Sequence, residues 1–236
     1  MKSSALGYRL RRLLREESAT ALVRIGAARG GEWSRKLVWT GESYIYRYEI
    51  ADVSSLISSP RIEGVEIKFI ECDADADRLA VEGYEDPRVV LRHAARRIRA
   101  GAVGCIAYVD KQFASAGWVG FCPEAKKTFD SLPYRVAFEN GEACTGGSWT
   151  ERRFRGKGLY AYVFGQELRY LRDCGRTTCR NSIPVGNLPS QLGQSRYGAR
   201  LCGVGRMTKV LWWRRWTERV AEGDCPSLAV VRNEAG

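Results

Sequence analysis

The segment that most constrains the fold is the stretch 142–171, which reads as a strand, a basic turn with two glycines, and a helix. After the turn, apolar residues recur every three or four positions, the spacing of a helix with one buried face. Such a turn leaves the first N–H groups of the helix unpaired, and the helix dipole adds partial positive charge there. Gly156 and Gly158 remove the Cβ atoms that would keep a ligand from the backbone. The sequence therefore predicts an anion site, above all for a phosphate, where this helix begins.

The six residues of the turn also carry a family resemblance. Residues 153–158, Arg-Phe-Arg-Gly-Lys-Gly, match an Arg/Gln-x-x-Gly-x-Gly/Ala signature, and the chain here resembles the GCN5-related N-acetyltransferase (GNAT) superfamily. They match neither a Walker loop nor the dinucleotide Gly-x-Gly-x-x-Gly pattern. A basic turn that only caps a helix is the alternative. The resemblance implies that the turn binds the pyrophosphate of acyl-coenzyme A, and that the donor contacts Ser148, Trp149, Thr150, Arg153, Phe154, Arg155, Gly156, Lys157, Gly158 and Leu159.

A second resemblance lies further along the chain. Members of the superfamily often have an asparagine, a small residue three positions later, and Gly-Phe at the end of their fourth helix. Here the corresponding residues are Asn187, Ser190 and Gly198-Ala199, and the final alanine is a departure from the pattern. The resemblance implies that Asn187 contacts the pantetheine arm and that the helix carrying Ser190 packs beside it.

Acyl transfer from a thioester to an amine requires a neutral amine, a stabilised oxyanion and a protonated leaving thiolate. In the superfamily two parallel neighbouring strands, the fourth and fifth, splay apart, and the acyl-pantetheine arm enters the gap. The resemblance thus puts backbone N–H groups near 148–150 within reach of the thioester carbonyl. Gly146 and Gly147 suit such a place, because strand glycines mark bulges or close approach of another backbone. A poorly formed strand is the alternative.

The proton-transfer groups follow from the same resemblance. The spacing of Glu142 from Arg155 resembles that of the general base of histone-type members, with Glu139 and Glu151 as competitors and a solvated carboxylate as the alternative. Many members have a tyrosine seven residues after the helix asparagine, where this chain has Gln194. Tyr197 lies three residues further on, roughly on the same helix face, and is the candidate acid. Otherwise the thiolate leaves without a protein acid.

The order of elements predicts an α/β fold with a mixed, mostly antiparallel central sheet flanked by helices. Its fourth and fifth strands are splayed, as in the acyl-CoA N-acyltransferase fold. A helix over 3–29 and a β-hairpin over 33–50, with its turn at 40–42, form a predicted extension. The predicted regions are an N-terminal extension over 1–64, a GNAT-like domain over 65–222 and a weakly ordered tail over 223–236.

Composition narrows the partners. The net charge of +11 favours an anionic partner: coenzyme A, a nucleotide-linked substrate, an acidic carrier protein, nucleic acid or an anionic membrane face. The eight cysteines form no Cys-x-x-Cys pair and the one histidine is His93, so no metal site is expected. Scattered thiols fit a reducing cytoplasm. The sequence contains no run of about 18 apolar residues, so no membrane-spanning helix is expected.

Together these features predict a cytoplasmic N-acyltransferase that moves an acetyl group from acetyl-CoA to a primary amine of a small molecule, amino sugar or protein. One alternative donor is an acidic acyl carrier protein with a longer acyl chain. A non-enzymatic alternative is that the basic helix and the cluster 212–216 bind nucleic acid or a membrane surface. A core strand with solvated arginines is the favoured interpretation of that cluster, so nucleic acid is not an expected partner. The acceptor and the oligomeric state stay open.

Overall fold

The computed structural model describes residues 38–50, 54–210 and 213–220. The chain divides into two compact units: Met1–Gly41 with Met207–Arg215, and the larger Glu42–Arg206 with Trp216–Gly236. The predicted helix over 3–29 and the predicted tail over 223–236 lie outside the described residues.

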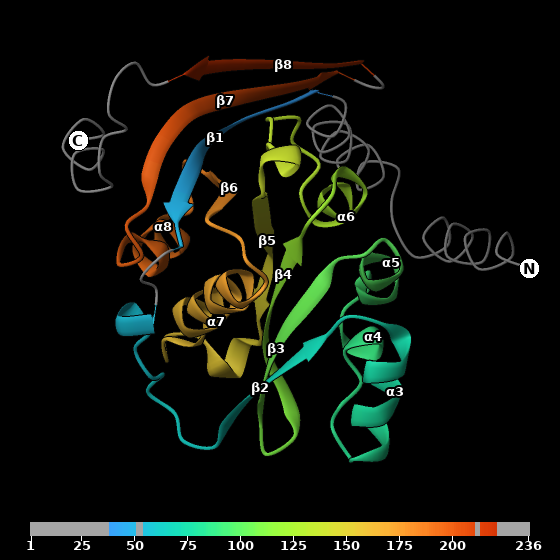
Figure 1. Ribbon diagram of the computed structural model, residues 1–236. Coiled ribbons are helices and arrows are strands. Elements are labelled where there is room, and N and C mark those ends of the chain that lie inside the picture. The colour runs from blue at the N-terminus through green and yellow to red at the C-terminus, as the bar shows by residue number, and fades with distance from the viewer. Residues whose placement is uncertain (1–37, 51–53, 211–212, 221–236) are drawn as a thin grey trace, which may run out of the picture. The chain divides into compact units, whose positions relative to one another are not determined.

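The described strands form one sheet in the order β2-β3-β4-β5-β6-β1-β7-β8. The pairs β2–β3, β3–β4, β4–β5 and β1–β6 are antiparallel, whereas β5 and β6 are parallel. The predicted mixed, mostly antiparallel sheet is thereby confirmed (Figure 1). The strands are β1 (Val38–Glu49), β2 (Val65–Ile70), β3 (Val103–Val109), β4 (Gln112–Gly120), β5 (Glu142–Thr150), β6 (Thr178–Pro184), β7 (Arg200–Val210) and β8 (Trp213–Val220).

Helices cover both faces of strands β3 and β4, because the side chains of each strand alternate between two cores. Ile106 and Tyr108 of β3 pack in one cluster with α3, α5 and α6, while Cys105 and Ala107 pack in another with α7. The helices are α3 (Asp73–Val81), α4 (Pro87–Val90), α5 (Ala94–Arg99), α6 (Pro123–Phe129), α7 (Leu159–Asp173) and α8 (Leu188–Ser195), with short 3-10 turns η1 (Ser54–Leu56), η2 (Phe138–Asn140) and η3 (Arg152–Phe154).

The predicted β-hairpin with its turn at 40–42 is wrong, because β1 runs through these residues as a single strand. The glycine that suggested a turn has another cause. A Cβ on Gly41 would lie 2.5 Å from the ring of Trp39, two residues away on the same face of the strand. Gly41 therefore makes room for an indole ring. Further along β1, Ser43–Glu49 pair with β6, so part of the predicted extension is hydrogen-bonded into the sheet.

A second difference lies in 122–133, which the sequence predicts as a connection. Residues Pro123–Phe129 form helix α6, with the proline in its first turn, where a missing N–H costs nothing. The helix packs against β4 and β5. Residues 134–138, whose alternating pattern is typical of a strand, form no strand. Residues 86–98, whose apolar stripe is typical of one helix, contain the pair α4 and α5. Helix α6 matters below, because the residue after it reaches the splayed strands.

Candidate functional site

The predicted anion site is a left-handed turn between η3 and α7. Gly156 has φ +75° and Gly158 has φ +81°, a region that side chains with a Cβ disfavour. The N–H groups of Phe154 and Arg155 close η3 on Glu151 and Arg152, at 2.9 and 3.3 Å. Past the turn, the first amide of α7 that reaches back into it is that of Tyr162, which donates to the Gly158 carbonyl at 3.1 Å. The turn is thus ordered by its own backbone.

Between these two sets of bonds lies a run of unused donors. Within the part of the chain that the structure describes, no group accepts a hydrogen bond from the N–H groups of residues 156–161. A Cβ placed on Gly156 would meet no atom within 4 Å, so the space over the turn is open. The carbonyl of Lys157 points the other way and accepts from Arg61 N–H at 2.8 Å. The amides therefore remain available to a ligand.

The predicted bulge is present where β5 lies against β4. Trp118 pairs with Gly146 and Ala116 pairs with Trp149, so β5 has one residue more than β4 over this interval. Gly147 has φ +60°, and a Cβ there would lie 2.8 Å from the Cβ of Phe129 on α6. The glycine permits both the left-handed backbone and the close helix.

Strands β5 and β6 separate as predicted. Their parallel ladder consists of Glu142↔Thr178, Ala143↔Cys179 and Cys144↔Arg180, and it stops there, although β5 continues to Thr150. This split between β5 and β6 lies on the same strand that leads into the turn at Gly156. Along the chain the order is therefore strand, split, turn and helix.

On the α7 and α8 side of the sheet, a buried polar network spans the split. Asn181 Nδ2 of β6 donates to Thr145 Oγ1 of β5 at 3.4 Å and to Gln194 Oε1 of α8 at 2.9 Å. Tyr48 OH of β1 also donates to Gln194 Oε1. Gln194 Nε2 donates to Tyr160 OH at 2.7 Å. Gln194, at the position where the resemblance expects a tyrosine, thus ties α8 to three other elements.

Tyr197, the candidate acid, lies in a packed environment against α7, and its hydroxyl takes no part in the side-chain network around Gln194. Its hydroxyl donates to the Ala161 carbonyl of α7 at 2.7 Å, and its ring packs edge-on against Phe164. Burial raises the pKa of Tyr197 to about 12. A Cβ on Gly165 would lie 2.5 Å from the same hydroxyl, so the tyrosine fills a notch in α7. These contacts favour a packing role, with the hydroxyl bound away from the β5–β6 network.

Glu142, the candidate base, lies at the paired end of β5. It is 4% exposed, and its Oε2 accepts from the Ala137 N–H at 2.7 Å. Its Oε1 accepts from Arg180 Nε at 3.1 Å. The split begins only beyond Cys144, so the structure does not bring Glu142 together with the other predicted residues. The competitors are also apart from the split: Glu139 pairs with Arg135, and Glu151 Oε1 accepts from the Arg152 N–H.

The remaining predicted residues lie around the end of β5 and the start of α8. Asn187 caps α8 by accepting from the Ser190 N–H at 3.3 Å. Thr150 Oγ1 is 2.8 Å from Ser115 Oγ of β4. Ser148 and Trp149 are exposed, and Arg155 Nε donates to the Thr150 carbonyl at 3.0 Å.

Two carboxyl groups near the split escaped the sequence analysis. Asp130 follows α6, a helix that the sequence did not predict, and its Oδ2 accepts from Ser182 Oγ of β6 at 2.7 Å. Glu167 of α7 is fully buried, and neither of its oxygens has a hydrogen-bond partner in the described part of the chain. A Cβ on Gly117 would lie 1.9 Å from Glu167 Oε1. A polar residue on the apolar stripe of α7 was the one available signal for Glu167.

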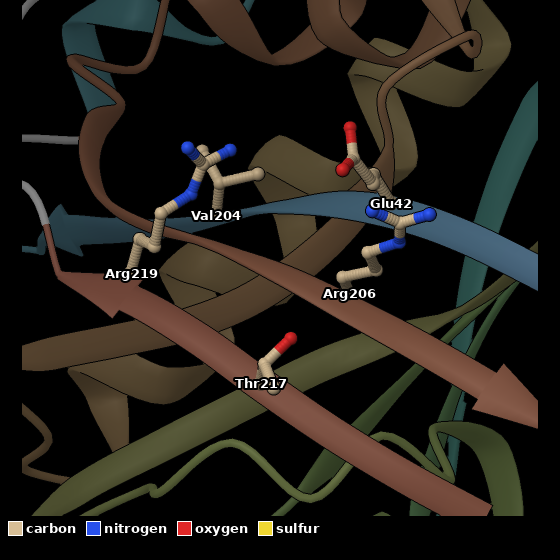
Figure 2. Close-up of a pocket in the computed structure, with 5 residues that line it drawn as sticks. All are labelled: Glu42, Val204, Arg206, Thr217 and Arg219. Carbon is tan, nitrogen blue, oxygen red and sulfur yellow. The ribbon is translucent and has the colours of Figure 1, made fainter.

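A separate cavity of about 300 Å³ is lined by side chains of β1, β7 and β8 (Figure 2). It holds two guanidinium groups, from Arg206 and Arg219, and the carboxylate of Glu42. It shares no lining residue with the turn at Gly156 or with the split. The exposed strand β8 carries the described part of the cluster 212–216, including Arg214, Arg215 and the half-exposed Trp213.

Comparisons with known proteins find likeness in structure. No family model matches the chain, and no curated protein matches it. Among solved structures, a functionally unknown conserved protein from Staphylococcus epidermidis is 12% identical, with TM-score 0.46 over 76% of this chain and 66% of that one. A GCN5-related N-acetyltransferase-like protein from Streptococcus suis is 14% identical, with TM-score 0.44 over 81% and 67%. A GCN5-related N-acetyltransferase from Kribbella flavida is 14% identical, with TM-score 0.44 over 70% and 56%.

Several matched structures thus bear the name of the superfamily that the motif at 153–158 resembles. The chain spans about half to two thirds of the length of the first three matched structures. In the described residues no group of side chains has the composition of a metal site, and none of the helices there is long and apolar enough to cross a membrane.

Proposed function

We propose that this protein is an acyl-CoA-dependent N-acyltransferase that moves an acetyl group to the primary amine of a small molecule, an amino sugar or a protein. One observation carries the proposal. The run of unused amides at residues 156–161 follows β5 after the short turn η3, and β5 is the strand that separates from β6 beyond Cys144. A phosphate site continuous with an open strand edge suits a donor with a pyrophosphate at one end and a long amide-bearing arm.

The residues present fit such a donor. The amides of 156–161 and the dipole of α7 would hold the pyrophosphate, with Arg153, Arg155 and Lys157 adding positive charge around it. The open space over Gly156 leaves room for phosphate oxygens against the backbone. Beyond the ladder, β5 offers backbone groups to which the pantetheine amides can bond, as an added strand does. The acyl end then lies toward the apex of the split.

When bound, acyl-CoA supplies an activated acyl carbon and a thiolate leaving group. The chain's part is to orient the acyl carbon and to stabilise charge on its oxygen. The bulge at Gly147 interrupts the β4–β5 ladder and re-aims backbone groups of β5. We assign the stabilising N–H donors to this interval, 146–150.

The test of this proposal is titration of the protein with acetyl-CoA by calorimetry. Gly156→Glu puts a negative side chain where nothing lies within 4 Å and where the phosphate would sit, so we expect acetyl-CoA affinity to fall at least about 100-fold. Gly175→Glu is the matched control. Gly175 has a similar φ of +74°, and a Cβ there would also meet no atom within 4 Å. It lies just past the end of α7. No binding by the wild type at millimolar acetyl-CoA, or equal binding by both variants, contradicts the proposal.

A further inference from the structure

On the face of the sheet that α6 covers, one carboxylate lies across the split. The Cβ of Asp130 is 3.9 Å from the position that a Cβ on Gly146 of β5 would take. Its Oδ2 accepts from Ser182 Oγ of β6 at 2.7 Å. The β5–β6 ladder has already ended at Cys144 and Arg180. Asp130 therefore hydrogen-bonds to β6 and lies near β5 just beyond the point where the two strands separate.

The surroundings of Asp130 hold it in place and leave it accessible. Tyr134 OH donates to Oδ2 at 2.7 Å, and the Leu132 N–H donates to Oδ1 at 2.9 Å. Lys126 lies 3.9 Å over the Tyr134 ring and donates to the Leu132 carbonyl. Tyr134 and Lys126 are buried, whereas Asp130 and Ser182 are partly exposed. Asp130 and Ser182 are thus the polar side chains of this cluster that retain some exposure to solvent.

We propose that Asp130 and Ser182 form the acceptor side of the site and that the acceptor is an amine that arrives as a cation. This inference rests on the proposed function, which puts the acyl carbon in the split between the same two strands. A carboxylate in a partly buried site attracts an ammonium group much more strongly than it would in water. Ser182 Oγ, which donates to the carboxylate, can still accept a hydrogen bond from the same nitrogen.

At Asp130 and Ser182 the transfer proceeds by proton removal, attack of the amine and departure of the thiolate. Asp130 takes one proton from the ammonium group, directly or through Ser182 Oγ, and later releases it to solvent. The neutral nitrogen forms a bond to the acyl carbon, and the carbon–sulfur bond breaks. The proton that the nitrogen loses after attack neutralises the departing thiolate. The products are an amide, a thiol and one released proton.

The first experiment locates the pair relative to the donor and needs no acceptor. In Ser182→Cys, we expect bromoacetyl-CoA to alkylate residue 182, forming a carbon–sulfur bond and releasing bromide, and excess coenzyme A to block the reaction. Ser195→Cys, on the exposed face of α8, is the control and should stay unlabelled. Peptide mass mapping separates these sites from native thiols such as Cys144. If the protein binds acetyl-CoA and residue 182 remains unlabelled, the proposal is overturned; if it does not bind acetyl-CoA, the proposed function fails first.

The second experiment tests the roles, with spermidine as the cationic probe and aniline as an amine that is neutral at pH 7.5. We expect acetyl transfer to spermidine, and a loss of about 100-fold or more in kcat/KM in Asp130→Asn at unchanged acetyl-CoA affinity. Ser182→Ala provides a second variant with less effect on the Lys126–Tyr134 packing. Glu63→Gln, at an exposed position, is the control and should keep the activity. Transfer to aniline alone, transfer to neither probe, or full activity of Asp130→Asn would overturn the assignment.

Discussion

Glu167 is an acidic residue that the described part of the protein encloses completely. Its side chain lies on α7 within the sheet-facing core, fully buried, and burial raises the pKa of its carboxyl well above the ordinary value. No hydrogen-bond partner in the described residues compensates either oxygen. An ionised carboxylate at this position would cost several kcal/mol, so the group folds in its protonated form.

This protonated carboxyl predicts a pH-dependent stability. The unfolded chain releases the Glu167 proton near pH 4.3, whereas the folded chain keeps it, so the free energy of unfolding falls as pH rises above that value. The slope is up to about 1.4 kcal/mol per pH unit and persists until the folded group ionises. Glu167→Gln removes this contribution. Urea unfolding from pH 5 to 8 should show a shallower decline for the variant than for wild type. Glu63→Gln, at an exposed position, should follow wild type; parallel curves for Glu167→Gln and wild type would refute the expectation.

At the scale of elements, the site depends on two irregularities of β5: its bulge and its departure from β6. Gly147 permits the first, because its φ of +60° and the nearness of Phe129 both exclude a larger residue. The second has no single cause in β5 itself. It coincides with side chains that bridge the gap, Thr145 to Asn181 on one face and Asp130 to Ser182 on the other.

Substitution at the bulge separates the two requirements on Gly147, a left-handed backbone and the close approach of Phe129. Gly147→Ala combines the backbone cost of a left-handed alanine, about 1–2 kcal/mol, with a contact of 2.8 Å to the Phe129 Cβ. Gly101→Ala, at φ +80° with no atom within 4 Å, carries the backbone cost alone. We therefore expect Gly147→Ala to lower the free energy of unfolding by about 1–3 kcal/mol more than the control, as measured by urea titration. An equal loss of unfolding free energy in both variants would show that α6 moves away from the added methyl group at no cost.

The turn and the bulge could be predicted from sequence because their causes are local. Glycines 147, 156 and 158 each meet a backbone requirement within a few residues. The turn predicted at Gly41 was wrong because the glycine is needed for a neighbouring indole ring, and a sequence does not show which way the Trp39 side chain turns. Helix α6 was missed since its proline reads equally as a loop signal or a first-turn residue. Asp130 was missed with it.

At the scale of the whole molecule, the sheet joins segments that are far apart in the sequence. Tyr48 of β1 reaches Gln194 of α8 and Asn181 of β6, so the network beside the split draws on residues more than a hundred positions apart. No periodicity or motif in the sequence indicates that Tyr48 pairs with Gln194 and Asn181. The sequence could therefore place the glycine turn, which one stretch builds, but not the side-chain network beside the split, which several elements assemble.

The net charge of +11 predicts that donor binding depends on salt. Coenzyme A brings several phosphate charges to a turn rich in arginine and lysine, on a chain whose overall field is positive. Raising sodium chloride from about 50 to 500 mM should weaken acetyl-CoA binding roughly tenfold, because screening shortens the reach of that field. Calorimetry at several salt concentrations measures this, with uncharged pantetheine as the control ligand. Salt-sensitive binding to nucleic acid, with none to acetyl-CoA, would instead favour a nucleic-acid-binding protein.

The contact between Gly117 and Glu167 has a consequence for how this chain can change over generations. With only 1.9 Å between a would-be methyl group and a carboxyl oxygen, a side chain at 117 would have to displace the end of the buried Glu167 side chain. A smaller residue at 167 would relieve that contact and leave a void that a side chain at 117 could fill. Descendant sequences should therefore fall into two sets, glycine with glutamate or a larger residue with a shorter one, with few intermediates surviving between them.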